Sequence, residues 1–139
     1  MQFEVDGHPV YAHTGGKDFD PTGDVVVLIH GAAMSHLAWS LQTRYLAHHG
    51  LSVLSLDLPG CGKSGGDLPE SIPDAAEWLV RVLDTLGIAR PSLVGHSMGA
   101  LIALQVAGTH PDRVNRLVLM GVGYPMAVND AFLDAADKD

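Results

Sequence analysis

The chain has 139 residues, of which 47% are apolar and 17% are charged, and its formal net charge is −8. This balance predicts one folded domain and excludes a disordered chain, and the acidic charge disfavours nucleic acid, whose phosphates need clustered Lys and Arg. No apolar run approaches the roughly 20 residues of a membrane span, so no membrane partner is expected. The sequence shows no signal-peptide pattern and has a single cysteine, Cys61. These two features predict a cytoplasmic protein.

The first elements expected along the chain are a hairpin and a buried strand. Residues 3–5 and 10–13 flank a turn that contains Asp6-Gly7, a pair typical of β-hairpins. Residues 25–29, Val-Val-Val-Leu-Ile, are apolar on both faces of an extended strand. Such a strand belongs in a parallel sheet that helices cover on both sides.

Strands and helices then alternate. Further strands are expected at residues 51–56, 92–94 and 116–120. A helix is expected after Ser35 up to Gly50, a second from a capping box at Ser71 to Gly87, and a third, apolar nearly all round and therefore central, at residues 98–109. This order predicts the α/β class, with a mostly parallel twisted sheet, helices on both faces and ligands at the carboxyl ends of the strands.

A serine motif lies where such a ligand site is expected. Gly95-His96-Ser97-Met98-Gly99 follows one expected strand and opens the next expected helix. The G-x-S-x-G pattern is short, but this strand-turn-helix context is typical of a nucleophilic serine on a tight turn. The glycines leave room for the turn, and the helix N-terminus lies behind the serine. The alternative interpretation is an ordinary glycine-rich turn.

Four motifs together resemble the α/β-hydrolase fold superfamily. Besides the serine motif, residues 28–33 (Leu-Ile-His-Gly-Ala-Ala) resemble its His-Gly turn, and residues 57–64 (Asp-Leu-Pro-Gly-Cys-Gly-Lys-Ser) resemble the turn after its fourth strand. Residues 117–120 are similar to its sixth strand. The resemblance covers about residues 3 to 125. It implies an α/β-hydrolase core, residues 1–125, truncated after about the sixth strand, with 126–139 as the start of a cap region or a frayed helical tail.

The resemblance also implies roles for single residues. Ser97 would attack an acyl carbonyl, and the backbone N–H groups of Met98 and Ala32 would hold the oxyanion. Preorganised donors of this kind each lower the barrier by about 3–4 kcal/mol. Gly31, Ala33 and His96 are the candidates for contact with the substrate, although the His96 side chain is expected to diverge from that of Ser97.

The acid and the base of a catalytic triad are not found in the sequence. In the superfamily the chain order is serine, acid, histidine, and the last two follow the seventh and eighth strands. The one histidine downstream of Ser97, His110, is expected at the far end of a helix, about 20 Å away. His30 and Asp57 are expected to order their own loops. Asp130, Asp134, Asp137 and Asp139 are expected on a solvated helix face.

Two functions from different classes remain open. The first is a serine hydrolase for a small ester or related acyl substrate, inactive as this chain alone, whose open apolar edge at residues 116–120 pairs with a complementary C-terminal half or another chain. The second is a non-catalytic fragment or pseudo-enzyme that acts as a binding module.

No cofactor and no metal are expected. His48-His49 has no neighbouring Cys or carboxylate ligands. Gly-Lys-Ser at residues 62–64 is not part of a phosphate loop, because the first glycine of that motif is replaced by Asp57. Cys61 is interpreted as a small loop side chain, with a modified thiol as the alternative.

Overall fold

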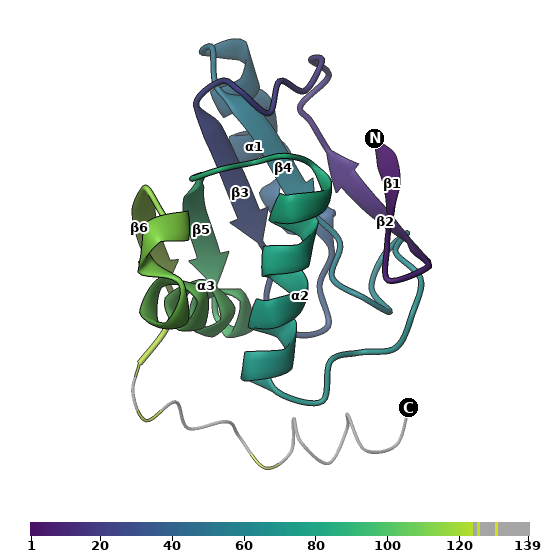
Figure 1. The fold of residues 1–139 in the computed structure, drawn as a ribbon, viewed down its shortest axis with the longest axis vertical. Coiled ribbons are helices and arrows are strands. Elements are labelled where there is room, and N and C mark those ends of the chain that lie inside the picture. Colours follow the sequence, from purple (N-terminus) through teal and green to yellow (C-terminus); the bar gives the residue numbers. More distant parts are fainter. Residues whose placement is uncertain (124, 126–129, 131–139) are drawn as a thin grey trace.

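The computed structural model describes residues 1–123, 125 and 130. A six-stranded sheet with the order β1-β2-β4-β3-β5-β6 lies at its centre (Figure 1). The strands are β1 (Gln2–Val5), β2 (His8–His13), β3 (Val25–Ile29), β4 (Ser52–Leu56), β5 (Ser92–His96) and β6 (Arg116–Met120). The helices are η1 (His36–Trp39), α1 (Ser40–His48), α2 (Ile72–Thr85), α3 (Met98–Thr109) and η2 (Pro111–Arg113). The expected α/β class is confirmed.

The N-terminal hairpin forms at one edge of the sheet. Its two-residue turn has φ values of 54° at Asp6 and 78° at Gly7, the left-handed pair that a tight hairpin needs. Because this turn is so short, β2 begins at His8, two residues earlier than predicted. β2 then pairs antiparallel with β4, whereas the pairs β4–β3, β3–β5 and β5–β6 are all parallel.

The predicted buried strand is the central strand. All five residues of β3 are buried, and β3 pairs with β4 on one side and β5 on the other. Parallel pairing brings the carboxyl ends of these strands to one edge of the sheet. The turn after β3, the loop after β4 and the Ser97 turn after β5 therefore all start from the same edge.

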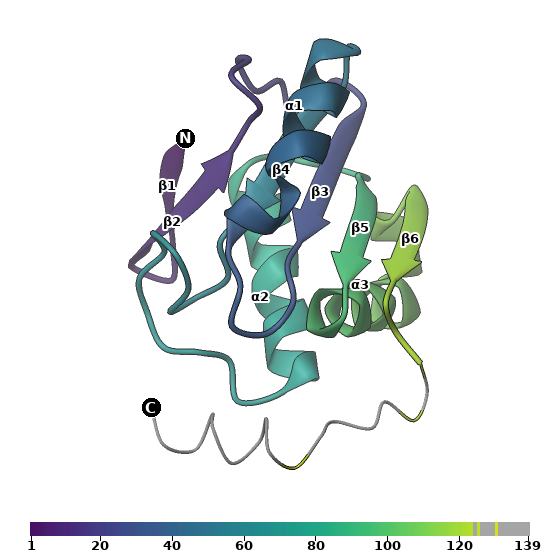
Figure 2. The same cartoon turned by 180° about the vertical axis from the view of Figure 1, so that it is seen from behind.

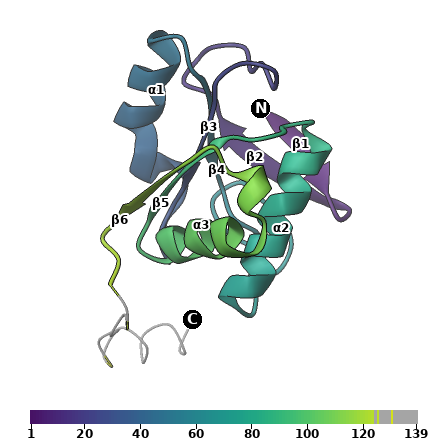
Figure 3. The ribbon, with the colours of Figure 1, turned by 60° about the vertical axis from the view of Figure 1, so that its left-hand side comes forward.

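Helices cover both faces of the sheet, as predicted. α1 lies on one face, where Trp39 and Ala47 pack with Val26 and Val53, and α2 and α3 lie on the other (Figures 2 and 3). α2 begins at the predicted cap, since the Ser71 hydroxyl accepts a hydrogen bond from the Asp74 N–H at 3.2 Å. The sheet therefore lies between two apolar clusters, one packed against α1 and the other against α2 and α3.

α3 and β6 are more exposed than a central position would allow. The α3 bounds agree with the prediction, but Leu104 on its outer side is 47% exposed, because α3 belongs to an outer helical layer. β6 is the edge strand, and its exposed residues include Val118 at 47% and Met120 at 44%. The expected open apolar edge is therefore found in the described part of the chain.

Two other expectations concern the C-terminal segment and the length of the helices. The cap region or helical tail expected at 126–139 lies outside the described residues, Asp130 apart. Within the described part of the chain, each helix is too short or too polar to cross a lipid bilayer.

Candidate functional site

Ser97 occupies a strained turn between β5 and α3. Its φ of 52° and ψ of −119° are left-handed values that a side chain makes unfavourable by about 1–3 kcal/mol. The turn is held at both ends: the Ser97 N–H donates to the Met120 carbonyl at 2.9 Å, and the Ser97 carbonyl accepts from the Ala100 N–H at 2.9 Å. The hydroxyl makes no capping hydrogen bond to α3, so it is left available for chemistry.

The two glycines of the motif are required by the packing around this turn. A Cβ atom at Gly95 would overlap the Gly99 carbonyl oxygen and lie 2.5 Å from the Ala100 Cα. A Cβ atom at Gly99 would overlap the Ile29 carbonyl oxygen. Real Cβ atoms do not approach other atoms this closely, so only glycine allows β5, α3 and β3 to meet beside Ser97.

The turn after β3 lies directly against the serine. A Cβ atom at Gly31 would lie 3.2 Å from the Ser97 Cβ, and Ala33 has a φ of 55°, unusual for a residue with a side chain. In the described part of the chain, no hydrogen-bond acceptor is found for the N–H groups of Ala32 and Met98. Met98 opens α3, where backbone donors are left unpaired and the helix dipole is positive. Two unpaired donors near a serine are what an oxyanion hole needs.

His30 links the turn after β3 to the loop after β4. Its ring is fully buried, donates from Nδ1 to the Gly31 carbonyl at 2.8 Å and accepts at Nε2 from the Leu58 N–H at 3.1 Å. Burial lowers the pKa of His30, which favours the neutral ring that these two bonds require. Both ring nitrogens are occupied, in agreement with the expectation that His30 orders its loop.

Asp57 is fully buried, and its carboxylate accepts hydrogen bonds from its own loop and from the segment after β3. It accepts hydrogen bonds from the His36 N–H at 2.7 Å, from the His36 Nδ1 at 2.9 Å and from the Lys63 N–H at 2.8 Å. A Cβ atom at Gly62, where φ is 55°, would overlap this carboxylate. The geometry agrees with the expected ordering role. The role of His36 was not predicted, since no local sequence pattern connects His36 with Asp57, 21 positions away.

The remaining candidates lie in different places. The His96 ring lies between the backbones of Gly31 and Gly121, beside Ser97 in the chain but packed against two turns. His110, at the far end of α3, contacts the Thr109 hydroxyl at 2.9 Å and Glu77 at 3.8 Å. Burial raises the pKa of the Cys61 thiol, which disfavours the reactive thiolate. No trio of potential metal ligands gathers among the described residues.

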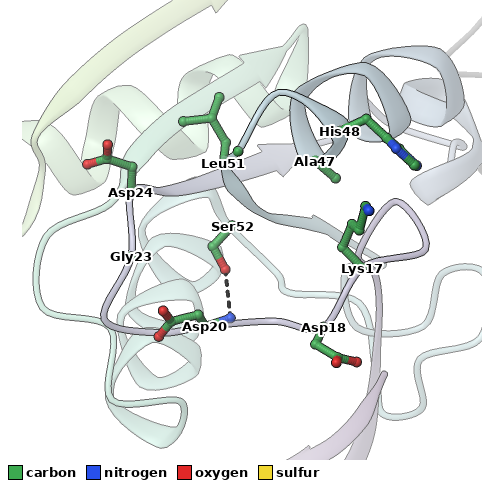
Figure 4. Close-up of a pocket in the computed structure, with 10 residues that line it drawn as sticks. Lys17, Asp18, Asp20, Gly23, Asp24, Ala47, His48, Leu51 and Ser52 are labelled. Carbon is green, nitrogen blue, oxygen red and sulfur yellow. Dashed lines mark hydrogen bonds between the residues drawn. The ribbon is translucent and has the colours of Figure 1, made fainter.

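A cavity of about 370 Å³ lies at the opposite edge of the sheet (Figure 4). It is lined by residues at the amino ends of β3 and β4, among them Asp20, Asp24 and Ser52. The Asp20 N–H donates to the Ser52 hydroxyl at 2.8 Å across its floor. Because amino and carboxyl ends of parallel strands lie at opposite edges, this cavity is separate from the Ser97 site.

A family model and two curated hydrolases match this chain. The family model described as alpha/beta hydrolase fold matches residues 24–139. The chain is 36% identical over 118 residues to (E)-2-((N-methylformamido)methylene)succinate hydrolase from Acinetobacter baylyi, covering 83% of this chain and 44% of that protein. It is 40% identical over 112 residues to the 2-hydroxy-6-oxononadienedioate/2-hydroxy-6-oxononatrienedioate hydrolase from Burkholderia vietnamiensis, covering 77% and 39%.

Among solved structures, the bottromycin epimerase BotH in complex with bottromycin A2 is 33% identical, with a TM-score of 0.75, and the match covers 99% of this chain and 55% of that one. The chain spans less than half the length of the two curated hydrolases. The family match begins at Asp24, just before β3, and includes the strained serine turn and both turns beside it. The chain belongs to the alpha/beta hydrolase fold family.

Proposed function

We propose that this chain supplies the nucleophile and the oxyanion hole of a serine hydrolase that acts on an ester or related acyl substrate. The observation that carries the proposal is the conformation of Ser97, whose φ of 52° is maintained by a glycine at each side that no other residue can replace. Structures keep such strain mainly where function needs it. Ser97 is the nucleophile, and the Ala32 and Met98 N–H groups are the oxyanion donors.

The reaction follows from these positions. The Ser97 Oγ gives its proton to the triad base, which is proposed below to come from outside the described residues, and forms a bond to the substrate carbonyl carbon. The electron pair of the C=O double bond moves to the oxygen. The Ala32 and Met98 N–H groups stabilise the resulting negative charge, and loss of one such donor typically lowers kcat by about 10²–10³. Collapse of the intermediate expels the leaving group, which takes the proton back from the base, and water then hydrolyses the acyl-serine to a carboxylic acid and free Ser97.

The base and the acid of the triad are proposed to come from outside the described residues. The His30 and His36 rings are engaged in buried hydrogen bonds, and the Asp57 carboxylate binds His36 and the Lys63 N–H. The two curated relatives are more than twice as long as the part that matches, which supports a complementary segment or chain. The exposed edge strand β6 offers the surface against which that part would pack, and its last residue, Met120, hydrogen bonds to the Ser97 N–H.

The names of the relatives favour small organic acids as substrates. Both curated hydrolases carry the name of a dicarboxylate, a succinate in one case and a dienedioate or trienedioate in the other. Gly31, Ala33 and His96 are the proposed contacts nearest the acyl group. No cofactor enters this chemistry, because every proposed group is a side chain or a backbone N–H.

A second candidate function is a binding module without hydrolytic activity. The observation that favours it is that the His30 ring and the Asp57 carboxylate are engaged in buried hydrogen bonds, so neither activates Ser97 as base or acid. Fold and reaction are separable, so membership of the family leaves this alternative open.

The test is labelling with a fluorophosphonate probe, after circular dichroism has shown that the chain is folded. The adduct is located by intact mass and peptide mapping in the wild type, in Ser97→Ala and in Ser92→Ala. Ser92 is the matched control, because it lies at the other end of the same strand. With the complementary part present, we expect an adduct on Ser97 in the wild type and in Ser92→Ala, and none in Ser97→Ala. A folded wild type that is not labelled, even with its complementary part present, would favour the binding module.

A further inference from the structure

The His96 ring contacts two separate turns beside the nucleophile. His96 is the last residue of β5 and pairs with Met120 of β6, so its backbone position is set by the sheet. A Cβ atom at Gly31 would lie 3.2 Å from the His96 Nδ1, and a Cβ atom at Gly121 would lie 3.2 Å from its Nε2. The two nitrogen-bearing edges of the ring therefore face the turn after β3 and the turn after β6.

Both turns contain a residue with a positive φ, which glycine adopts readily but which is unfavourable for a residue with a side chain such as Ala33. Gly121 has a φ of 60°, and Ala33, two residues after Gly31, has a φ of 55°. A residue with a side chain keeps such a φ only where the surrounding structure enforces it. On one side of Gly31 the enforcing contact is the hydrogen bond from His30, and on the other side it is the His96 ring.

Ala32, the proposed oxyanion donor, lies between Gly31 and the strained Ala33. A shift of the Gly31 backbone would carry the Ala32 N–H with it, since the two residues share a peptide bond. Catalytic groups are sensitive to such shifts, and a displacement of about 1 Å can cost roughly 10²-fold in rate. The position of the His96 ring therefore bears on how well the oxyanion is held.

We propose that His96 is a positioning residue that keeps the Ala32 N–H in place beside Ser97 by filling the space between Gly31 and Gly121. The flat ring acts as a spacer, and glycine at both positions allows its close approach. This inference rests on the proposed function, because it assigns His96 to the oxyanion hole of that reaction. It differs from the expected substrate contact, since the ring acts through the backbone of Gly31.

The experiment uses the full chain labelled with ¹⁵N and compares His96→Ala with His96→Asn. The asparagine amide keeps a planar polar group near Gly31 but lacks the ring edge that faces Gly121. We expect His96→Ala to shift the amide resonances of Gly31 and Ala32 and to speed hydrogen exchange at Ala32. His96→Asn should restore the Ala32 resonance toward the wild type and leave that of Gly121 shifted.

The control variant is His110→Ala, which removes another partly exposed histidine at the far end of α3. It should leave the Ala32 resonance and exchange rate unchanged. The same variants are compared for the rate at which the fluorophosphonate modifies Ser97. We expect a decrease of about 10-fold in His96→Ala and a smaller decrease in His96→Asn, because the donor is displaced rather than removed.

The outcomes separate this inference from the proposed function. An unchanged Ala32 resonance and an unchanged labelling rate in folded His96→Ala would overturn the positioning role. If the wild type is not labelled even with its complementary part present, the proposed function fails, and the Ala32 resonance alone decides whether His96 sets the turn. If His96→Ala does not fold, His96→Asn decides the question, and a wild-type Gly121 resonance in that variant would count against it.

Discussion

The strain at Ser97 predicts that removal of its side chain stabilises the protein. Left-handed values such as those of Ser97 cost a residue with a Cβ about 1–3 kcal/mol, and glycine avoids this cost. Glycine also makes the unfolded chain more flexible, which offsets about 0.4–1 kcal/mol. We therefore expect Ser97→Gly to be more stable than Ser97→Ala by about 1 kcal/mol, although neither can react with the probe.

The difference is measurable by thermal and urea unfolding followed by circular dichroism. For a chain of this size about 1 kcal/mol corresponds to a rise in Tm of roughly 4 °C. The same two substitutions at Ser92, in the extended part of β5, serve as the control pair. There the alanine variant should be more stable by about 0.5–1 kcal/mol. If Ser97→Gly is no more stable than Ser97→Ala, the strain does not exist in solution and the argument for a nucleophile elbow loses its basis.

Three further predictions follow from contacts elsewhere in the chain. Gly95→Ala should destabilise the protein by about 3 kcal/mol, because the new Cβ overlaps backbone atoms. Gly108→Ala, on the exposed side of α3, should stabilise it by about 0.5–1 kcal/mol. The midpoints of urea unfolding measure both changes, and equal effects of the two substitutions would contradict the packing argument. Val118→Lys should reduce binding of a hydrophobic dye and self-association measured by light scattering, whereas Leu104→Lys, equally exposed but away from the sheet edge, should change neither. Burial lowers the pKa of His30 below its usual 6.5, so the ring binds a proton more readily in the unfolded state. The free energy of unfolding should therefore fall as the pH drops below about 6.5. A titration midpoint of the His30 ring at or above 6.5, measured by NMR, would refute this prediction.

Much of the fold could be predicted from local patterns in the sequence. The bounds of β3, α3 and β6 agree with the expected ranges, because a continuous apolar run and a glycine turn are signals within a few residues of one another. β5 extends two residues beyond the expected 92–94. Its last residues belong to the Gly95-His96 motif, so a glycine that usually signals a turn lies inside the strand there.

The site was only partly predictable, since its contacts join distant parts of the chain. The motif around Ser97 indicated the nucleophile and the need for small residues at 95 and 99. It gave no indication that Gly99 faces the backbone of β3 or that the His96 ring lies between Gly31 and Gly121. Those contacts exist because β3 and β6 both pair with β5, and strand order is a property of the whole sheet.

The sequence by itself determined the α/β class, the order of strands and helices, and Ser97 as the candidate nucleophile, because each depends on residues close together in the chain. Only the tertiary structure decided which hydrogen-bond partners the buried polar side chains have. His36 and Asp57 meet because the turns after β3 and β4 start from the same edge of the sheet, and a buried carboxylate needs donors from whichever segments the fold brings to it. Spacing along a sequence carries no information about such a meeting, whereas parallel pairing of neighbouring strands makes it unavoidable.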